Sequence, residues 1–300
     1  MDAAAWALAH THAVAAIERW WAEGELVRVP VAGAQRAIFL RRAGAGATLT
    51  LLHGFPSSSH DWEALLPALA RRHRVLALDF LGFGASEKPP EHDYSIAEQA
   101  DVVQAVWAHE RVDATALLVH DYAVTVAQEL LARRAEGALR TELASLRFLN
   151  GGLYADVYRP LPGQLALLDP ELGPKISAQL NREAFVEGLR ATFAEGFDST
   201  GAREQMWEAM SRAQGQLSIH RLIRYMSERQ QHAERWQRAL ESADVPLAFV
   251  WGMLDPISGA HMAQRIRERL PRAPLTALER VSHWPMLEAP ERVSEAIASA

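Results

Sequence analysis

The chain of 300 residues contains no cysteine. It therefore has no disulfide bond, no thiolate metal site and no cysteine nucleophile. It also lacks any run of about 18 apolar residues, which argues against a membrane span. Its 31 basic residues are outnumbered by 37 acidic ones, so the chain lacks the basic surface typical of a nucleic-acid-binding protein. A composition with 49% hydrophobic and 23% charged residues instead indicates a globular protein with a large core.

The first 21 residues are rich in alanine but are interrupted by charges. A secretory signal needs a basic start and an unbroken apolar stretch, and this segment has neither. We therefore expect a cytoplasmic protein. Within the same segment Trp6, Ala13, Ile17 and Trp20 recur at helical spacing, which predicts a helix packed on the surface of the domain.

Short apolar and β-branched runs alternate with helix-length patterns along the chain. The runs predict eight strands, at residues 26–31, 37–41, 48–52, 74–78, 116–119, 146–149, 247–251 and 275–278. The intervening patterns predict helices at residues 61–71, 96–109, 123–134 and 258–269. Early strands followed by strand–helix alternation indicate an α/β fold, with a mostly parallel sheet flanked by helices on both faces.

This alternation stops after residue 152. From residue 153 to residue 243 the sequence reads as helices and loops, and strand-like character returns near Pro246. The simplest organisation is a helical cap (153–243) inserted between two parts of one α/β core (1–152 and 244–300).

The residues that can carry chemistry follow predicted strands. An HGFP motif at 53–56 follows the run TLTLL, and its glycine permits a backbone shape that presents an N–H group to a cleft. Asp121 lies between a predicted strand and a predicted helix, where a sharp turn would lift its side chain above the sheet. Asp255 and His283 follow the last two predicted strands.

These residues resemble the α/β-hydrolase superfamily. The order nucleophile, acid, histidine is that of the superfamily, and it matches Asp121, Asp255 and His283. The HGFP motif and the DFLGFGAS turn at 79–86 resemble the epoxide hydrolase and haloalkane dehalogenase branches. The segments HDYAVTVAQELL, FLNGGLY and RYMSERQ are similar to the mesoderm-specific-transcript proteins, a subgroup with an aspartate nucleophile. The resemblance implies an α/β-hydrolase fold with an eight-stranded sheet and a helical cap.

Three positions depart from the pattern of the family. Small residues, often glycine, usually flank the nucleophile turn, whereas this chain has Val119 and Ala123 there. Val124 is also larger than the glycine common at its position. The effect of these side chains on activity stays open.

An aspartate nucleophile restricts the reaction class. A carboxylate that attacks a saturated carbon forms an alkyl ester, which water can then hydrolyse. The resemblance implies that Asp121 is this nucleophile, that His283 activates the water and that Asp255 orients His283. It also implies that the backbone N–H groups of Phe55 and Tyr122 bind the oxyanion.

The leaving group separates the two branches. Epoxide opening yields an alkoxide. In the epoxide hydrolases, the hydroxyl groups of two cap tyrosines donate hydrogen bonds to this alkoxide. The resemblance assigns Tyr225 to one of these places and Tyr154 to the other, with Tyr158 as its alternative. Dehalogenases instead offer side-chain N–H groups where this chain has Tyr122 and Phe55, which favours an epoxide.

We therefore predict an epoxide hydrolase that acts on a small apolar epoxide and water, with no cofactor, no metal and no nucleic-acid partner. A haloalkane dehalogenase and a non-catalytic ligand-binding protein with the same fold are the alternatives. Asn150 follows the sixth predicted strand, where a family member can carry the acid, but an amide cannot serve as one. Glutamates offset Arg224, Arg229 and Arg235, which predicts a solvated face of the cap.

Overall fold

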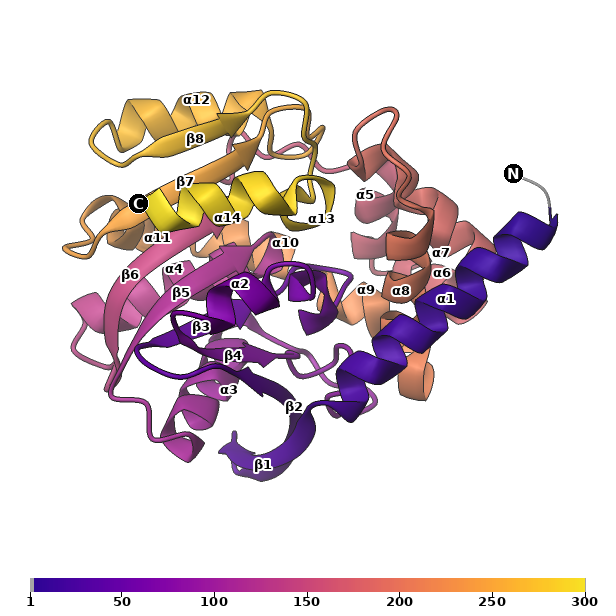
Figure 1. The fold of residues 1–300 in the computed structure, drawn as a ribbon, viewed down its shortest axis with the longest axis horizontal. Helices are drawn as coiled ribbons and strands as arrows, with labels where there is room; N and C mark the ends of the chain where they lie inside the picture. The colour runs from indigo at the N-terminus through magenta and orange to yellow at the C-terminus, as the bar shows by residue number, and fades with distance from the viewer. Residues whose placement is uncertain (1–2, 300) are drawn as a thin grey trace.

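An eight-stranded sheet forms the centre of the molecule (Figure 1). The computed structural model describes residues 3–299. The strands are β1 (Glu25–Val31), β2 (Ala34–Ala43), β3 (Thr48–Leu52), β4 (Arg74–Leu78), β5 (Ala114–His120), β6 (Glu142–Leu149), β7 (Leu247–Gly252) and β8 (Leu275–Leu278). Their order in the sheet is β1-β2-β4-β3-β5-β6-β7-β8. The first two strands pair antiparallel, and all pairs from β4 to β8 are parallel.

The predicted strands are thus confirmed, and their sequences explain their places. The run TLTLL of β3 is buried over its last four residues, as a strand covered on both faces must be. Strand β1 alternates exposed and buried residues, which suits its place at the edge of the sheet. The parallel strands all end at the same side of the sheet, and the residues that follow them therefore meet there.

Helices cover both faces of the sheet, as predicted. Helices α2 (Leu66–Ala70) and α14 (Pro290–Ser299) lie on one face, and α3 (Ile96–His109) and α4 (Tyr122–Ala135) lie on the other (Figure 1). Helix α12 (Ala260–Arg269) follows β7, and the short α13 (Pro285–Glu288) follows β8.

The predicted helix at 61–71 differs from the structure. A 3₁₀ helix, η1 (Ser59–Trp62), precedes the short α2 instead. Pro67 explains the break, because proline fits the first turn of a helix but not its interior.

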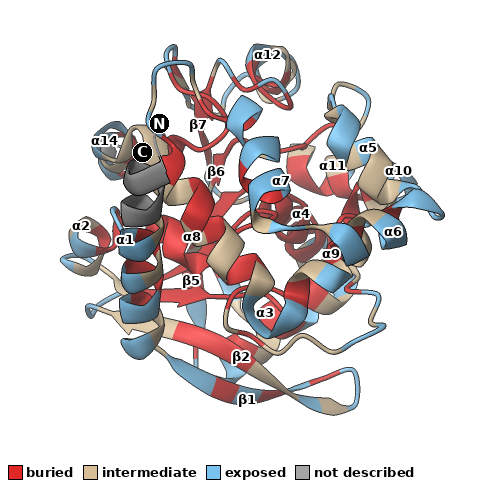
Figure 2. Cartoon of the chain, turned by 90° about the vertical axis from the view of Figure 1, so that its right-hand side faces the viewer, coloured by how far each residue is buried: buried red, intermediate tan, exposed pale blue. Residues whose placement is uncertain are grey.

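The region between β6 and β7 is helical, as predicted. It holds the α-helices α5 (Pro162–Leu168), α6 (Leu172–Gln179), α7 (Arg182–Gly188), α8 (Thr200–Ser211), α9 (Ile219–Leu222), α10 (Tyr225–Gln231) and α11 (Ala233–Glu241), and the 3₁₀ helices η2 (Arg190–Thr192) and η3 (Arg212–Ser218). Helices α5 to α9 stand beside the sheet in Figure 1, whereas α11 packs on α4. One apolar cluster joins the sheet to cap residues such as Phe185, Met206 and Leu222, and buried segments accordingly run from the strands into α8 (Figure 2).

The predicted N-terminal helix is α1 (Ala3–Ala22). Ala13, Ile17 and Trp20 are buried on one side of it, while the side chain of Trp6 lies outside the described residues. Helix α1 packs along α8 of the cap, and the Trp20 indole donates to Ser59 Oγ of the core at 3.0 Å. Among residues 3–299, none of the helices is long and apolar enough to cross a membrane.

Candidate active site

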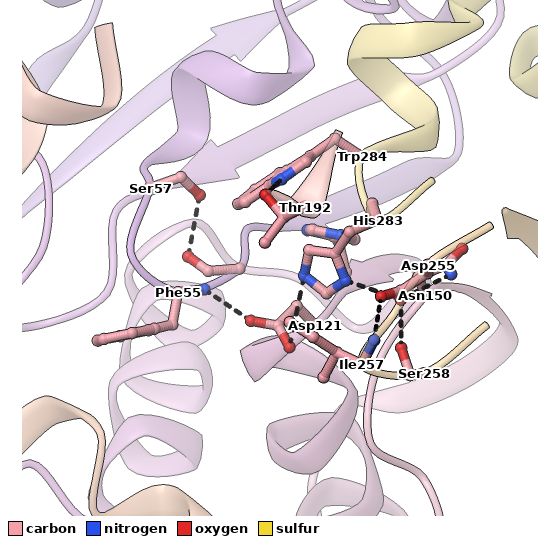
Figure 3. Close-up of polar contacts among 12 residues, drawn as sticks. Phe55, Ser57, Asp121, Asn150, Thr192, Asp255, Ile257, Ser258, His283 and Trp284 are labelled. Atoms are coloured by element: carbon pink, nitrogen blue, oxygen red, sulfur yellow. Dashed lines mark hydrogen bonds and ion pairs between the residues drawn. The ribbon is translucent and has the colours of Figure 1, made fainter. Parts of the chain in front are cut away.

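Three loops at the ends of parallel strands bring the predicted triad together. Asp121 follows β5, Asp255 follows β7 and His283 follows β8. All three side chains are buried, and Figure 3 shows the imidazole of His283 between the two carboxylates. Residues more than 130 positions apart in the chain meet here because parallel strands end on one side of the sheet.

Asp121 occupies a strained turn between β5 and α4. Its φ of 46° and ψ of −103° lie in a region that residues other than glycine rarely adopt. The Asp121 N–H donates to the Asn150 carbonyl at 2.8 Å, which ties the turn to the end of β6. The turn lifts the carboxylate out of the sheet and toward the cap.

Two glycines make room for this turn. A Cβ at Gly54 would lie 2.9 Å from Asp121 Cβ, and a Cβ at Gly151 would lie 3.0 Å from Asp121 Cα. The same Cβ at Gly151 would lie 2.7 Å from a methyl group of Val124. Gly151 therefore provides the space that the unusually large Val124 needs, and Ala123 is fully buried without disrupting α4.

The two carboxylate oxygens of Asp121 have different surroundings. Oδ2 accepts a hydrogen bond from the backbone N–H of Phe55 at 3.1 Å. Tyr122 is the first residue of α4, so its N–H has no partner within the helix and points toward the same end. Oδ1 lies 3.9 Å from His283 Nε2, which is too far for a hydrogen bond.

Burial raises the pKa of Asp121, while His283, Arg229 and the Phe55 N–H oppose this shift.

A dense network holds Asp255 against His283. Asp255 Oδ2 accepts from His283 Nδ1 at 2.8 Å, from Ser258 Oγ at 2.6 Å and from Asn150 Nδ2 at 2.9 Å. Asp255 Oδ1 accepts from the Ile257 N–H at 2.8 Å. Burial disfavours the charge, but His283 and these donors hold the pKa of Asp255 well below its usual range. The carboxylate accepts the Nδ1 proton of His283, which leaves Nε2 facing Asp121.

The proton affinity of His283 follows from this geometry. Burial alone would lower the pKa of His283, but the carboxylates of Asp255 and Asp121 raise it to about 9. Both carboxylates therefore favour the imidazolium form of His283 as long as they are charged.

The loop that carries His283 is held from the core and from the cap. Glu288 accepts hydrogen bonds from the backbone N–H groups of Ser282 at 2.9 Å and Trp284 at 3.2 Å. Thr192 of the cap accepts from the His283 N–H at 3.1 Å through its carbonyl and from the Trp284 indole at 2.8 Å through its hydroxyl (Figure 3). The cap thus helps to fix the imidazole.

The structure places two of the three candidate tyrosines near Asp121. The Tyr225 ring lies between those of Phe55 and Tyr122, with centroids 5.9 Å and 4.9 Å away. Its hydroxyl is buried and interacts with the hydroxyl of Tyr158. Burial and the Asp121 carboxylate raise the pKa of Tyr225 well above its usual range. The same two causes raise the pKa of Tyr158 to about 12, against the opposing charge of Arg229.

Tyr154 lies elsewhere. Its ring packs near the Arg265 guanidinium, 5.7 Å away, and lines a polar hollow between α11 and α12. Burial and Glu241, rather than Asp121, raise its pKa. The structure thus places Tyr158, rather than Tyr154, near Asp121, because the chain turns between the two tyrosines and presents them to different sides.

The expectation that Arg224, Arg229 and Arg235 form a solvated face of the cap is wrong for Arg229. Arg224 is exposed and pairs with Asp93, and Arg235 pairs with Glu129 and Glu136, as expected of a solvated face. Arg229 instead is 2% exposed and lies beside Tyr158 and Tyr225. One turn of α10 separates it from Tyr225, so helical spacing was the signal that could have placed it at the site.

Asn150 also has a part that the sequence did not reveal. It does not replace the acid but donates to it, and its Oδ1 accepts from the Gly252 N–H at 2.6 Å. Its place at the end of β6, directly beside β7, explains why it reaches Asp255.

An apolar cavity of about 330 Å³ opens beside His283, and Asp121, Tyr158 and Tyr225 are not among its lining residues. Phe55, His283 and Trp284 form its core side, and aliphatic residues of α5, α6 and α7 form its cap side. His283 is its only titratable lining residue among the residues that the structure describes, and Gln164 is the one amide. Such a cavity suits a small, neutral, apolar molecule.

The fold is that of an α/β-hydrolase. A family model for the alpha/beta hydrolase fold matches residues 47–290, and the chain belongs to this family. The chain is 38% identical over 261 residues to "Putative hydrolase LipZ" of Mycobacterium tuberculosis, with 86% of this chain and 90% of that protein covered. It is 39% identical over 258 residues to the mesoderm-specific transcript protein of Mus musculus, with 82% and 76% covered.

A solved structure shows the same fold. The haloalkane dehalogenase DbeA from Bradyrhizobium elkani superposes with a TM-score of 0.76 at 19% identity, over 92% of this chain and 97% of that one. The predicted family and fold class are therefore confirmed.

Proposed function

We propose that the protein hydrolyses epoxides to vicinal diols through a covalent ester of Asp121. The observation that carries the proposal is the pair of buried Tyr225 and Tyr158 hydroxyls, which interact with each other and with the carboxylate of Asp121 at the turn after β5. An epoxide oxygen is the acceptor that such a pair of donors would activate.

The geometry assigns different tasks to the two oxygens of Asp121. Oδ1 attacks the less hindered epoxide carbon, the ring C–O bond breaks, and the alkoxide takes a proton from Tyr225 or Tyr158. Oδ2 keeps its hydrogen bond from Phe55 and becomes the carbonyl oxygen of the ester.

The second step returns the enzyme to its starting state. Forming the ester removes the charge of Asp121, which is one cause of the raised pKa of His283. The imidazolium then gives up its proton more readily, and the phenolate formed in the first step can take it. Neutral His283 accepts a proton from water, and the hydroxide attacks the carboxyl carbon of Asp121. The N–H groups of Phe55 and Tyr122 stabilise the oxyanion until the diol leaves, protonated by His283. The new carboxyl group of Asp121 then gives its proton to His283, which restores the starting carboxylate and imidazolium.

Halide release is the second candidate, because the superposed structure is that of a dehalogenase. It needs side-chain N–H donors near Asp121. Phe55 has none, the Tyr122 hydroxyl is directed to the Tyr94 carbonyl at 3.5 Å, and the Trp284 indole donates to Thr192. These contacts favour an epoxide over an alkyl halide.

The test is a single turnover of 1,2-epoxyhexane in water enriched in oxygen-18, with 1-bromohexane in parallel. We expect unlabelled diol, and one solvent oxygen in the peptide that contains Asp121. Labelled diol with an unlabelled peptide would rule out the ester. Bromide from bromohexane without diol from the epoxide would identify a dehalogenase instead.

Replacing Tyr225 with phenylalanine should slow epoxide opening by about 100-fold, because the alkoxide loses an acidic donor. The measurement is the rate of ester formation under single-turnover conditions. Tyr154→Phe is the matched control, since its ring faces the polar hollow, and it should open epoxides at the wild-type rate. Equal rates for Tyr225→Phe and the wild type would remove Tyr225 from this role.

A further inference from the structure

The guanidinium of Arg229 lies directly behind the two tyrosines. Its Nε and Nη2 atoms donate to Thr125 Oγ1 at 3.1 Å and 2.9 Å, and Thr125 is on α4, four residues after Asp121. Its Cζ lies 4.7 Å from the centre of the Tyr158 ring and 4.9 Å from that of Tyr225. One cation therefore contacts both phenol rings and is anchored to the helix that begins at the nucleophile.

The charge of Arg229 is not neutralised by a close partner. Within residues 3–299, no carboxylate forms an ion pair with it, and Nη1 has no hydrogen-bond partner. Gly152 lies so close to Nη1 that a Cβ atom at position 152 would be only 2.0 Å from Nη1. A buried, unpaired cation is expensive, and its persistence at this place calls for a function.

The rings of Tyr158 and Tyr225 contact the guanidinium of Arg229. Like both tyrosines and Asp121, Arg229 is not among the residues that line the apolar cavity. The electrostatic effect of Arg229 reaches three groups of the site. It lowers the pKa of Asp121, of Tyr158 and of Tyr225 against the effect of burial.

We propose that Arg229 is a positioning residue that holds Tyr158 and Tyr225 over Asp121 and strengthens both hydroxyls as donors to the oxygen of the bound molecule. The inference rests on the proposed epoxide opening for its catalytic consequence. A cation near a phenol ring favours the developing phenolate as the proton moves to the alkoxide. The same cation helps to keep Asp121 ionised for the attack.

The kinetic test uses the His283→Gln background, in which the ester should accumulate and its formation can be followed by intact mass. Arg229→Met should slow the reaction with 1,2-epoxyhexane by roughly tenfold to a hundredfold. Arg229→Lys keeps the charge and should restore part of the rate. With 3,3,3-trifluoro-1,2-epoxypropane, whose alkoxide is more stable, the loss should be smaller.

A double-mutant cycle separates this role from general damage. In the Tyr158→Phe/Tyr225→Phe background, Arg229→Met should have no further effect on the rate. Arg235→Met is the matched control, because it removes another cap arginine whose partners, Glu129 and Glu136, lie away from the site. It should leave the rate unchanged. The proposal would be overturned if Arg229→Met slowed ester formation as much in the Tyr158→Phe/Tyr225→Phe background as it does when both tyrosines are present. It would also be overturned if a folded Arg229→Lys variant recovered none of the lost rate.

A binding measurement distinguishes failure of this inference from failure of the proposed function. N-propylhexanamide is neutral, and its carbonyl oxygen can accept from both hydroxyls without any reaction. Calorimetry should show about tenfold weaker binding to Arg229→Met and no such loss in Arg235→Met. If the wild type opens no epoxide but this difference holds, the proposed function fails and the role of Arg229 stands. Equal affinity of Arg229→Met and the wild type for the amide would refute the proposed role of Arg229.

Discussion

Replacement of Asp121 with alanine should abolish epoxide turnover, with a loss of at least about 10⁴-fold. The reason is that Asp255, the other carboxylate that contacts His283, is not placed to attack. Asp255 is occupied by four hydrogen bonds and lies on the far side of His283. The measurement is diol formation under multiple turnover, together with a search for a covalent adduct by intact mass.

The same variant should be at least as stable as the wild type. Burial raises the pKa of Asp121, so the site disfavours the carboxylate, and its removal should leave the free energy of unfolding unchanged or higher. Asp156→Asn, which alters an exposed carboxylate paired with Arg265, is the control and should keep full activity. Diol formation by Asp121→Ala at the wild-type rate would contradict the ester mechanism.

The strands and the order of the triad were predictable because each has a local signature. Strand β3 is a continuous apolar run, and Asp121 lies where a strand pattern changes to a helix pattern. Helix α3 was predicted with its observed bounds, since Ser95 caps its start by accepting from the Glu98 N–H. In contrast, Pro67 interrupts a periodic pattern, and that pattern alone overestimated the helix around α2.

The cap side of the site was harder to predict because its contacts join distant segments. Tyr154 and Tyr158 are four residues apart, and only the path of the chain decides which of them meets Tyr225. The environment of Arg229 depends on Thr125, 104 positions earlier, which no local pattern indicates. The nearby glutamates predicted that Arg229 faces solvent, whereas the packing of α10 against α4 buries its side chain.

Replacement of His283 with glutamine should stop the reaction after the first step. Asp121 can still attack, but water loses its general base, and ester hydrolysis should fall by roughly 10³-fold. The enzyme should then gain the whole mass of one epoxide, because ring opening expels no atom. A bromoalkane would instead add its mass less that of hydrogen bromide, so one spectrum also discriminates between the two leaving groups. An unmodified variant that has also lost epoxide turnover would exclude the ester as an intermediate.

The pH dependence of the second step should report on the same histidine. In the resting enzyme the carboxylates of Asp255 and Asp121 raise the pKa of His283 to about 9, against the effect of burial. The ester carries no charge at Asp121, so the pKa of His283 must be lower in the intermediate than in the resting enzyme. Ester hydrolysis should therefore rise with pH and level off below pH 9, while residual hydrolysis in His283→Gln should not follow this curve. A wild-type rate that still rises in proportion to hydroxide above pH 9 would mean that solvent hydroxide, rather than His283, drives the step.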